Sequence, residues 1–161
     1  MNLPNHDAKL TFDSPVGAVT LLASNNKVVF LTMGSDVTPD FGKASVLKDA
    51  KKQLTSYFKG KTKELNFDFE LQGTDFQKAV WKEIAKIGFG EITTYADIAK
   101  NIGNPNAVRA VGGAVGSNPV PLVVGCHRVL GASGRITGYS GGDGIPTKRW
   151  LLALEGIETT D

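Results

Sequence analysis

Cysteine and histidine are scarce in this chain of 161 residues. Cys126 is the only cysteine, and His6 and His127 are the only histidines. A single cysteine excludes an intrachain disulfide and argues against a zinc site built on thiolates. The two histidines lie far apart and match no metal-ligand spacing. We therefore expect neither a bound metal nor a cofactor.

Long apolar runs and a strong charge of either sign are also missing. No stretch approaches the length of a membrane span, and the first ten residues lack the apolar core of a secretory signal. We expect a cytoplasmic protein in a reducing compartment, without a membrane partner, where a thiol stays free. The net charge of +2 permits nucleic-acid binding but does not argue for it.

Residues 1–72 are predicted to form a small N-terminal α/β domain. Short β-branched runs predict a three-stranded antiparallel meander over residues 9–33, and apolar spacings of three and four predict a helix over 43–59. Phe67 and Phe69 alternate with polar residues as in a strand. The lysines of the helix are interpreted as a solvated face, with phosphate binding as the alternative.

Residues 73–161 are predicted to form a second, mostly helical domain. A capping box at its start opens a first helix over 74–87. Residues 93–103 predict a second helix and residues 107–116 a third, for which Asn106 is the expected cap. The turn between these two helices is typical of a helix-turn-helix. The expected fold class is therefore α+β, with two domains that meet at residue 72.

The third helix has few side chains that could read a DNA sequence. Gly112, Gly113, Ala114 and Gly116 leave it nearly bare, and Arg109 is its one cation. Glycine disfavours a helix interior, so this composition fits an element to which another helix or a DNA strand comes close. Without further context, close helix packing with a solvated arginine is the slightly favoured explanation.

Cys126 follows an apolar run over 120–124 that predicts a strand, and His127 and Arg128 come directly after it. A lone cysteine often packs as a small hydrophobe. Cationic neighbours, however, favour the thiolate, which is the nucleophilic form of the side chain. We therefore interpret Cys126 as a nucleophile.

Glu155 ends the last predicted helix, where a carboxylate meets the negative end of the helix dipole. A partner such as His127 would explain its presence, and Cys126, His127 and Glu155 would then form a nucleophile relay. Adjacent Cys and His residues are unusual for a peptidase, so a cysteine hydrolase fits poorly. A nucleophile beside a helix-turn-helix suggests chemistry on DNA. The alternative is a helix-turn-helix regulator in which Cys126 only packs or senses redox state.

The C-terminal part of the chain resembles the O6-alkylguanine-DNA alkyltransferases, also called methylated-DNA–protein-cysteine methyltransferases. The resemblance rests on short motifs that occur in the order of that family. These motifs are GTDFQ at 73–77, FGE at 89–91, TY at 94–95, GNP at 103–105, RAVGGA at 109–114, NPVP at 118–121, CHRV at 126–129, GYSGG at 138–142, WLL at 150–152 and EG at 155–156.

The resemblance implies a repair protein that flips an alkylated guanine out of duplex DNA and takes the alkyl group onto Cys126. His127, acting through a water and held by Glu155, would draw off the thiol proton. Asn118 would support the turn at the cysteine, and Tyr95 would donate a hydrogen bond to guanine N3. Each molecule would act once, because a thioether has no easy route back to a thiolate.

The resemblance also implies the contacts to the lesion and to the duplex. Ser140 would contact O6 and Val129 the base edge, while Arg109 would fill the gap left by the flipped nucleotide. The bare helix would lie in the minor groove. The full set of expected substrate and DNA contacts is Arg109, Val129, Tyr139, Ser140, Gly141, Ala107, Gly112, Gly113 and Ala114.

Some features depart from the family pattern. Gly125 stands where the family usually has proline, which loosens the backbone before Cys126. The structural zinc of some members has no ligand set in residues 1–72. We expect a monomer that acts on duplex DNA containing O6-alkylguanine, and the sequence leaves open whether O4-alkylthymine is also a substrate. The alternative is a non-catalytic, damage-sensing relative, against which the presence of Cys126 argues.

Overall fold

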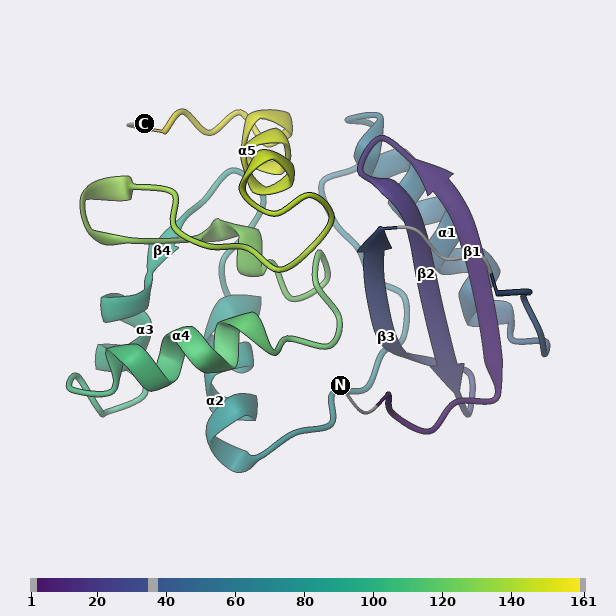
Figure 1. Cartoon of the computed structure of the whole chain (residues 1–161), viewed down its shortest axis with the longest axis horizontal. Helices are drawn as coiled ribbons and strands as arrows, with labels where there is room; N and C mark the ends of the chain where they lie inside the picture. Colours follow the sequence, from purple (N-terminus) through teal and green to yellow (C-terminus); the bar gives the residue numbers. More distant parts are fainter. Residues whose placement is uncertain (1–2, 35–37, 160–161) are drawn as a thin grey trace. The chain divides into compact units, whose positions relative to one another are not determined.

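The computed structural model describes residues 3–34 and 38–159, and the chain divides into two compact units, residues 1–72 and 73–161 (Figure 1). The N-terminal unit contains an antiparallel sheet in the order β1-β2-β3. Its strands are β1 (Ala8–Ser14), β2 (Gly17–Ser24) and β3 (Lys27–Gly34). Asn25 and Asn26 both have positive φ, as a two-residue hairpin turn between β2 and β3 requires. The predicted meander is confirmed.

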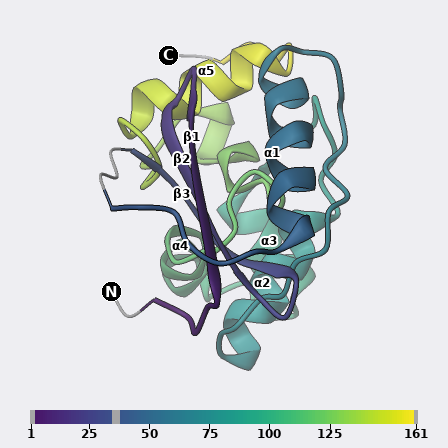
Figure 2. The ribbon, with the colours of Figure 1, turned by 90° about the vertical axis from the view of Figure 1, so that its right-hand side faces the viewer.

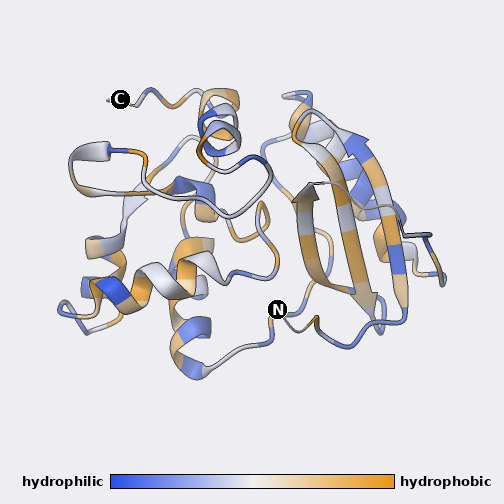
Figure 3. Cartoon of the chain, viewed as in Figure 1, coloured by the Kyte–Doolittle hydropathy of each residue, from blue (hydrophilic) through white to orange (hydrophobic). Residues whose placement is uncertain are grey.

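Helix α1 (Ser45–Phe58) lies along one face of this sheet (Figures 1 and 2). Its apolar side contributes Leu54, Tyr57 and other buried residues to the core of this unit. Hydrophobic residues are dense along β2 and β3 (Figure 3). The strand predicted around Phe67 and Phe69 was wrong. Only Val28 pairs with this segment, through Asp68 and Glu70, so the pairing stops at an isolated bridge.

The C-terminal unit begins with three short helices. They are α2 (Asp75–Ala85), α3 (Tyr95–Asn101) and α4 (Val108–Gly116), with the short strand β4 (Thr93–Thr94) before α3. Thr74 and Gln77 form the predicted capping box at α2. The indole N–H of Trp81 donates to the carbonyl of Ala114 at 2.9 Å, which ties α2 to α4 inside the core.

The rest of this unit is built from short segments and one helix. A 3-10 turn, η1 (Cys126–Arg128), leads into β5 (Val129–Leu130), which pairs in parallel with β4. A second such turn, η2 (Ala132–Gly134), precedes α5 (Ile145–Leu154), which has Pro146 in its first turn. No helix in the described ranges is long and apolar enough to cross a bilayer.

Two local predictions for the C-terminal unit were wrong. Asn106 does not cap α4, because Asn104 accepts from the amide of Ala107 in a turn and the helix begins one residue later. The apolar run over 120–124 is buried but is not a strand. Leu122 has a φ of 78°, and the amide of Val124 donates to the carbonyl of Val120, so the run folds back on itself.

Candidate active site

Cys126 is placed by the tight turn that precedes it. Gly125 has φ −73° and ψ 65°, and the amide of Cys126 donates to the carbonyl of Val124 at 2.7 Å, as in an inverse γ-turn. Asn118 braces this turn, since its amide nitrogen donates to the Val124 carbonyl at 2.7 Å. The side-chain oxygen of Asn118 accepts from the amide of Val120 at 3.0 Å. The cysteine is therefore held at a rigid corner.

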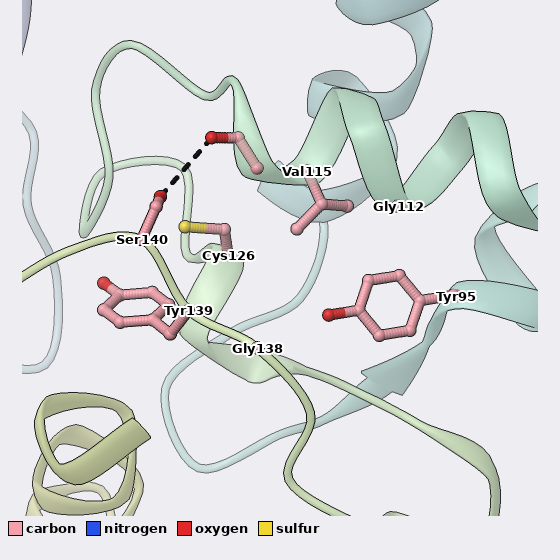
Figure 4. Close-up of a pocket in the computed structure, with 8 residues that line it drawn as sticks. Tyr95, Gly112, Val115, Cys126, Gly138, Tyr139 and Ser140 are labelled. Atoms are coloured by element: carbon pink, nitrogen blue, oxygen red, sulfur yellow. Dashed lines mark hydrogen bonds between the residues drawn. The ribbon is translucent and has the colours of Figure 1, made fainter. Parts of the chain in front are cut away.

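The sulfur of Cys126 faces a cavity of about 310 Å³ (Figure 4). Five of the residues predicted to contact substrate or DNA, or to act in catalysis, line it: Tyr95, Gly112, Cys126, Tyr139 and Ser140. The hydroxyl of Tyr95 points into the cavity from the start of α3 (Figure 4). The hydroxyl of Ser140 donates to the carbonyl of Gly116 at 3.4 Å and so joins the loop to the end of α4. Val115, Gly116 and Gly138 also line the cavity, although the sequence analysis did not select them.

Glu155 is a buried carboxylate shared by several donors. It meets His127, as its place in the sequence suggested, with Oε2 at 2.6 Å from Nε2 of the imidazole. The Arg128 guanidinium donates to both of its oxygens, from Nε at 2.8 Å and from Nη2 at 3.0 Å. The amide of Gly90 donates to Oε1 at 3.1 Å. The carboxylate is thus ionised and fixed, and it orients the imidazole.

The interpretation that Arg128 stabilises the thiolate was wrong. Its guanidinium is bound to Glu155 and, through Nη1, to the carbonyl of Ile87 at 2.8 Å. The cation that acts on Cys126 is Lys148, on α5, which the sequence analysis missed. Lys148 is wholly buried and donates to the carbonyl of Val129 at 2.6 Å. Its only signal in the sequence was its place in the first half of an apolar helix.

The ionisation of the site follows from its burial. Burial raises the pKa of the Cys126 thiol above its usual 9.0, against the opposing effects of Asn118, Lys148 and Tyr139. Burial also lowers the pKa of His127 below 6.5, although Glu155 favours the charged ring. Burial lowers the pKa of Lys148 to about 8. The thiol therefore keeps its proton until a base removes it, and His127 is neutral and able to act as that base.

The free nitrogen of His127 is the atom available for this step. With Nε2 bound to Glu155, the imidazole presents Nδ1, which is buried and has no hydrogen-bond partner among the described residues. A buried nitrogen without a partner costs about 1–3 kcal/mol. A water that bridges Nδ1 to the thiol would remove this cost and carry the proton.

The remaining predicted contact residues lie on two elements. On α4, Arg109 and Gly113 are exposed, Ala107 is half-buried at the N-cap and Ala114 is buried. Figure 3 draws α4 mostly in white and orange, in keeping with its single charged residue.

On the cysteine side of the site, Val129 is buried and its carbonyl accepts from Lys148. Gly141 is half-buried in the loop before α5. In the described ranges, no three His, Cys, Asp or Glu side chains gather as a metal site would require.

Comparison with known proteins covers both units. The family described as "6-O-methylguanine DNA methyltransferase, DNA binding domain" matches residues 75–157, and its "ribonuclease-like domain" matches residues 9–71. The methylated-DNA–protein-cysteine methyltransferase of Mycobacterium bovis is 45% identical over 153 residues, which cover 90% of each chain. The protein of the same name from Methanosarcina acetivorans is 42% identical over 151 residues, which cover 90% of this chain and 96% of that one.

Solved structures agree with this assignment. The O6-methylguanine methyltransferase of Mycobacterium tuberculosis superimposes with a TM-score of 0.81 at 41% identity over 95% of both chains. A structure of the same bacterium's protein in complex with DNA also gives 0.81, at 45% identity over 90% of both chains. The chain therefore belongs to the methylated-DNA–protein-cysteine methyltransferase family.

Proposed function

We propose that this protein repairs duplex DNA by moving the alkyl group of O6-alkylguanine onto Cys126. The observation that carries the proposal is a buried thiol at the wall of a 310 Å³ cavity, next to a neutral histidine that a buried glutamate orients. The Mycobacterium tuberculosis relative has been solved in complex with DNA, which supports DNA as the partner. We expect this protein to act as a monomer.

The transfer is a displacement at the alkyl carbon. His127 takes the thiol proton through a water, and the sulfur of Cys126 then attacks the carbon bound to O6. A carbon–sulfur bond forms while the carbon–oxygen bond breaks, and that electron pair stays on guanine. Tyr95 donates a hydrogen bond to N3 and offsets the developing charge, and guanine finally takes up one proton. Glu155 and Asn118 act as positioning residues for His127 and Cys126.

The target base has to leave the helix to reach the sulfur. The bare face of α4 would lie in the minor groove, where Ala107, Gly112, Gly113 and Ala114 let the backbone come close and Arg109 fills the gap in the base stack. Around the extruded base, Val129, Tyr139, Ser140 and Gly141 form the expected contacts. Extrusion costs a few kcal/mol and least for a damaged base, which favours the lesion.

The alternative, a damage-sensing protein without transfer chemistry, is not favoured by the site. A relative that only binds the lesion needs no thiol at the cavity wall and no oriented base beside it. Here Cys126 lines the cavity and Glu155 binds His127, which supports transfer over binding alone.

The test is a single-turnover reaction with a duplex that carries one O6-methylguanine. The intact protein should gain one methyl group, the modified peptide should contain Cys126, and the Cys126→Ala variant should gain none. An unchanged mass together with tight, lesion-selective binding would overturn transfer in favour of damage sensing. Methyl uptake from a second duplex, which carries O4-methylthymine, tests under the same conditions whether that lesion is also a substrate.

A further inference from the structure

Thr137 lies in the loop before α5, two residues from Tyr139, and no role has been assigned to it so far. Its hydroxyl donates to the hydroxyl oxygen of Tyr95 at 3.2 Å. We propose that Thr137 is a positioning residue that aims the Tyr95 proton at the flipped base and so assists the departure of guanine. This inference rests on the proposed function.

The hydroxyl of Tyr95 carries a single proton. A phenol can donate one hydrogen bond while its oxygen accepts others. Because the oxygen accepts from Thr137, the phenolic proton has to point elsewhere, and the hydroxyl of Tyr95 faces the cavity (Figure 4). A hydroxyl that accepts a hydrogen bond also becomes a stronger donor. The pair therefore sets both the direction and the strength of the Tyr95 hydrogen bond.

Gly131 leaves room for one conformation of the Thr137 side chain. A Cβ atom built on Gly131 would lie 2.8 Å from the methyl carbon of Thr137, which is too close for a real contact. Gly131 has φ −76°, which any residue adopts, so its backbone does not require glycine. The missing side chain at position 131 instead leaves room for the methyl group. With the methyl placed there, the stiff χ1 of threonine directs the hydroxyl to Tyr95.

The backbone of Thr137 is held by Lys148. The buried ammonium of Lys148 donates to the carbonyls of Thr137 and Gly138, each at 3.4 Å, and to the carbonyl of Val129 at 2.6 Å. It thereby joins the loop to β5, the strand that follows Cys126. The backbone of Thr137 is thus held in place directly beside Gly138, which lines the cavity, although the Thr137 side chain is exposed.

The position of Thr137 lets departure of guanine be tested apart from the reactivity of the Cys126 thiol. Thr137 acts through Tyr95 on the leaving base and has no contact with Cys126 or His127 in the structure's hydrogen-bond network. Loss of its hydroxyl should slow transfer from a guanine lesion and leave the intrinsic reactivity of the thiol unchanged. A purely structural role would reduce both.

The experiment compares single-turnover transfer from an O6-methylguanine duplex at saturating protein. Thr137→Val keeps the β-branched shape and should slow transfer about fivefold, the size expected for one weakened hydrogen bond to the transition state. Thr137→Ser keeps the hydroxyl and should restore most of the rate. Gly131→Ala keeps Thr137 but crowds its methyl, and it should slow transfer like Thr137→Val. In a Tyr95→Phe background, Thr137→Val should have no further effect.

Two controls make the result decisive. Alkylation of Cys126 by iodoacetamide involves no guanine leaving group, so its rate should be the same in Thr137→Val and wild type. Thr62→Val, which deletes an exposed hydroxyl in the N-terminal unit, should match wild type in both assays. Equal transfer rates for wild type and Thr137→Val, or an equal loss in both assays, would overturn the inference. Failure of the wild-type protein to take up any methyl group would instead refute the proposed function.

Discussion

At the residue scale, the site depends on one carboxylate that binds two partners of different kinds, a guanidinium cation and a neutral imidazole. Glu155 accepts from Arg128 through both oxygens and from His127 through one. A buried carboxylate with only the imidazole as partner would draw a proton onto the ring and remove the base. Burial is the largest cause of the lowered pKa of His127, and the fixed charge of Arg128 adds to it against the raising effect of Glu155. Arg128 therefore helps to keep the pKa of His127 low, although it does not contact the thiol.

Gly125 gives a prediction at the same scale. Its φ of −73° already suits proline, and proline at a compatible site limits the unfolded chain and stabilises by about 0.4–1 kcal/mol. A Cβ at this position, however, would lie 2.8 Å from Nη1 of Arg128, so the guanidinium has to shift. We expect Gly125→Pro to change the free energy of unfolding by less than about 1 kcal/mol and to speed transfer about twofold, because the turn before Cys126 becomes stiffer.

Gly125→Ala is the matched control for this prediction. It introduces the same Cβ beside Arg128 without fixing φ, so it isolates the effect of crowding. Urea unfolding and single-turnover transfer measure the two quantities. Equal transfer rates for wild type and Gly125→Pro would show that the flexibility of glycine does not limit the reaction.

At the element scale, the glycines of α4 lower the stability of this helix, and we propose that they are kept because they let DNA come close. A Cβ at Gly112, Gly113 or Gly116 would meet nothing within 4 Å, so packing within the chain does not require these glycines. We expect Gly113→Ala to stabilise the protein by about 0.5–1 kcal/mol, the usual gain in a helix interior. The added methyl should weaken binding to duplex DNA if, as we propose, this face of α4 lies in the minor groove.

Thermal unfolding and a duplex-binding titration at fixed salt concentration test this prediction. Gly113 lies outside the cavity wall, so iodoacetamide alkylation of Cys126 should stay at the wild-type rate. Unchanged DNA affinity in a more stable Gly113→Ala protein would show that this face does not approach the duplex.

The sequence predicted elements well where a local signal determined them. The capping box at Thr74 and the asparagine pair in the β2–β3 turn needed only neighbouring residues. Prediction failed where a distant partner decides the outcome. The segment around Phe69 has a single bridging neighbour, Val28, and the run over 120–124 turns back because Asn118 holds its ends. Periodicity cannot report either constraint.

At the scale of the whole molecule, the sequence motifs identified the family and most of the residues that line the cavity. They did not predict the hydrogen bonds that Thr137 and Lys148 make around it. Tyr95 and Thr137 are 42 residues apart, and Lys148 and Val129 are 19 apart. Neither pair forms a motif, because each depends on how β4 and β5 align and how α5 packs. Sequence patterns thus selected the candidate reactive residues together with Glu155 and Asn118, whereas the contacts of Thr137 and Lys148 became visible only in the fold.

Acid sensitivity of folding gives a prediction that involves the entire protein. Burial keeps the pKa of His127 below 6.5, and unfolding returns the ring to water and to its usual value. As the pH falls through 6.5, the unfolded chain therefore binds a proton that the folded chain does not, so stability contributed by this residue is present above pH 6.5 and is lost below it.

We expect the urea midpoint of wild type to fall between pH 7.5 and pH 5.5, and to fall less in His127→Gln. Lys148 titrates between about 8 and 10.5 and the Cys126 thiol above 9.0, so neither affects this window. His6→Gln is the matched control, because it removes the other histidine at a position outside the buried site. The same slope in wild type and His127→Gln would mean that the imidazole takes up its proton as readily in the folded protein as in the unfolded chain, which would contradict a pKa lowered by burial.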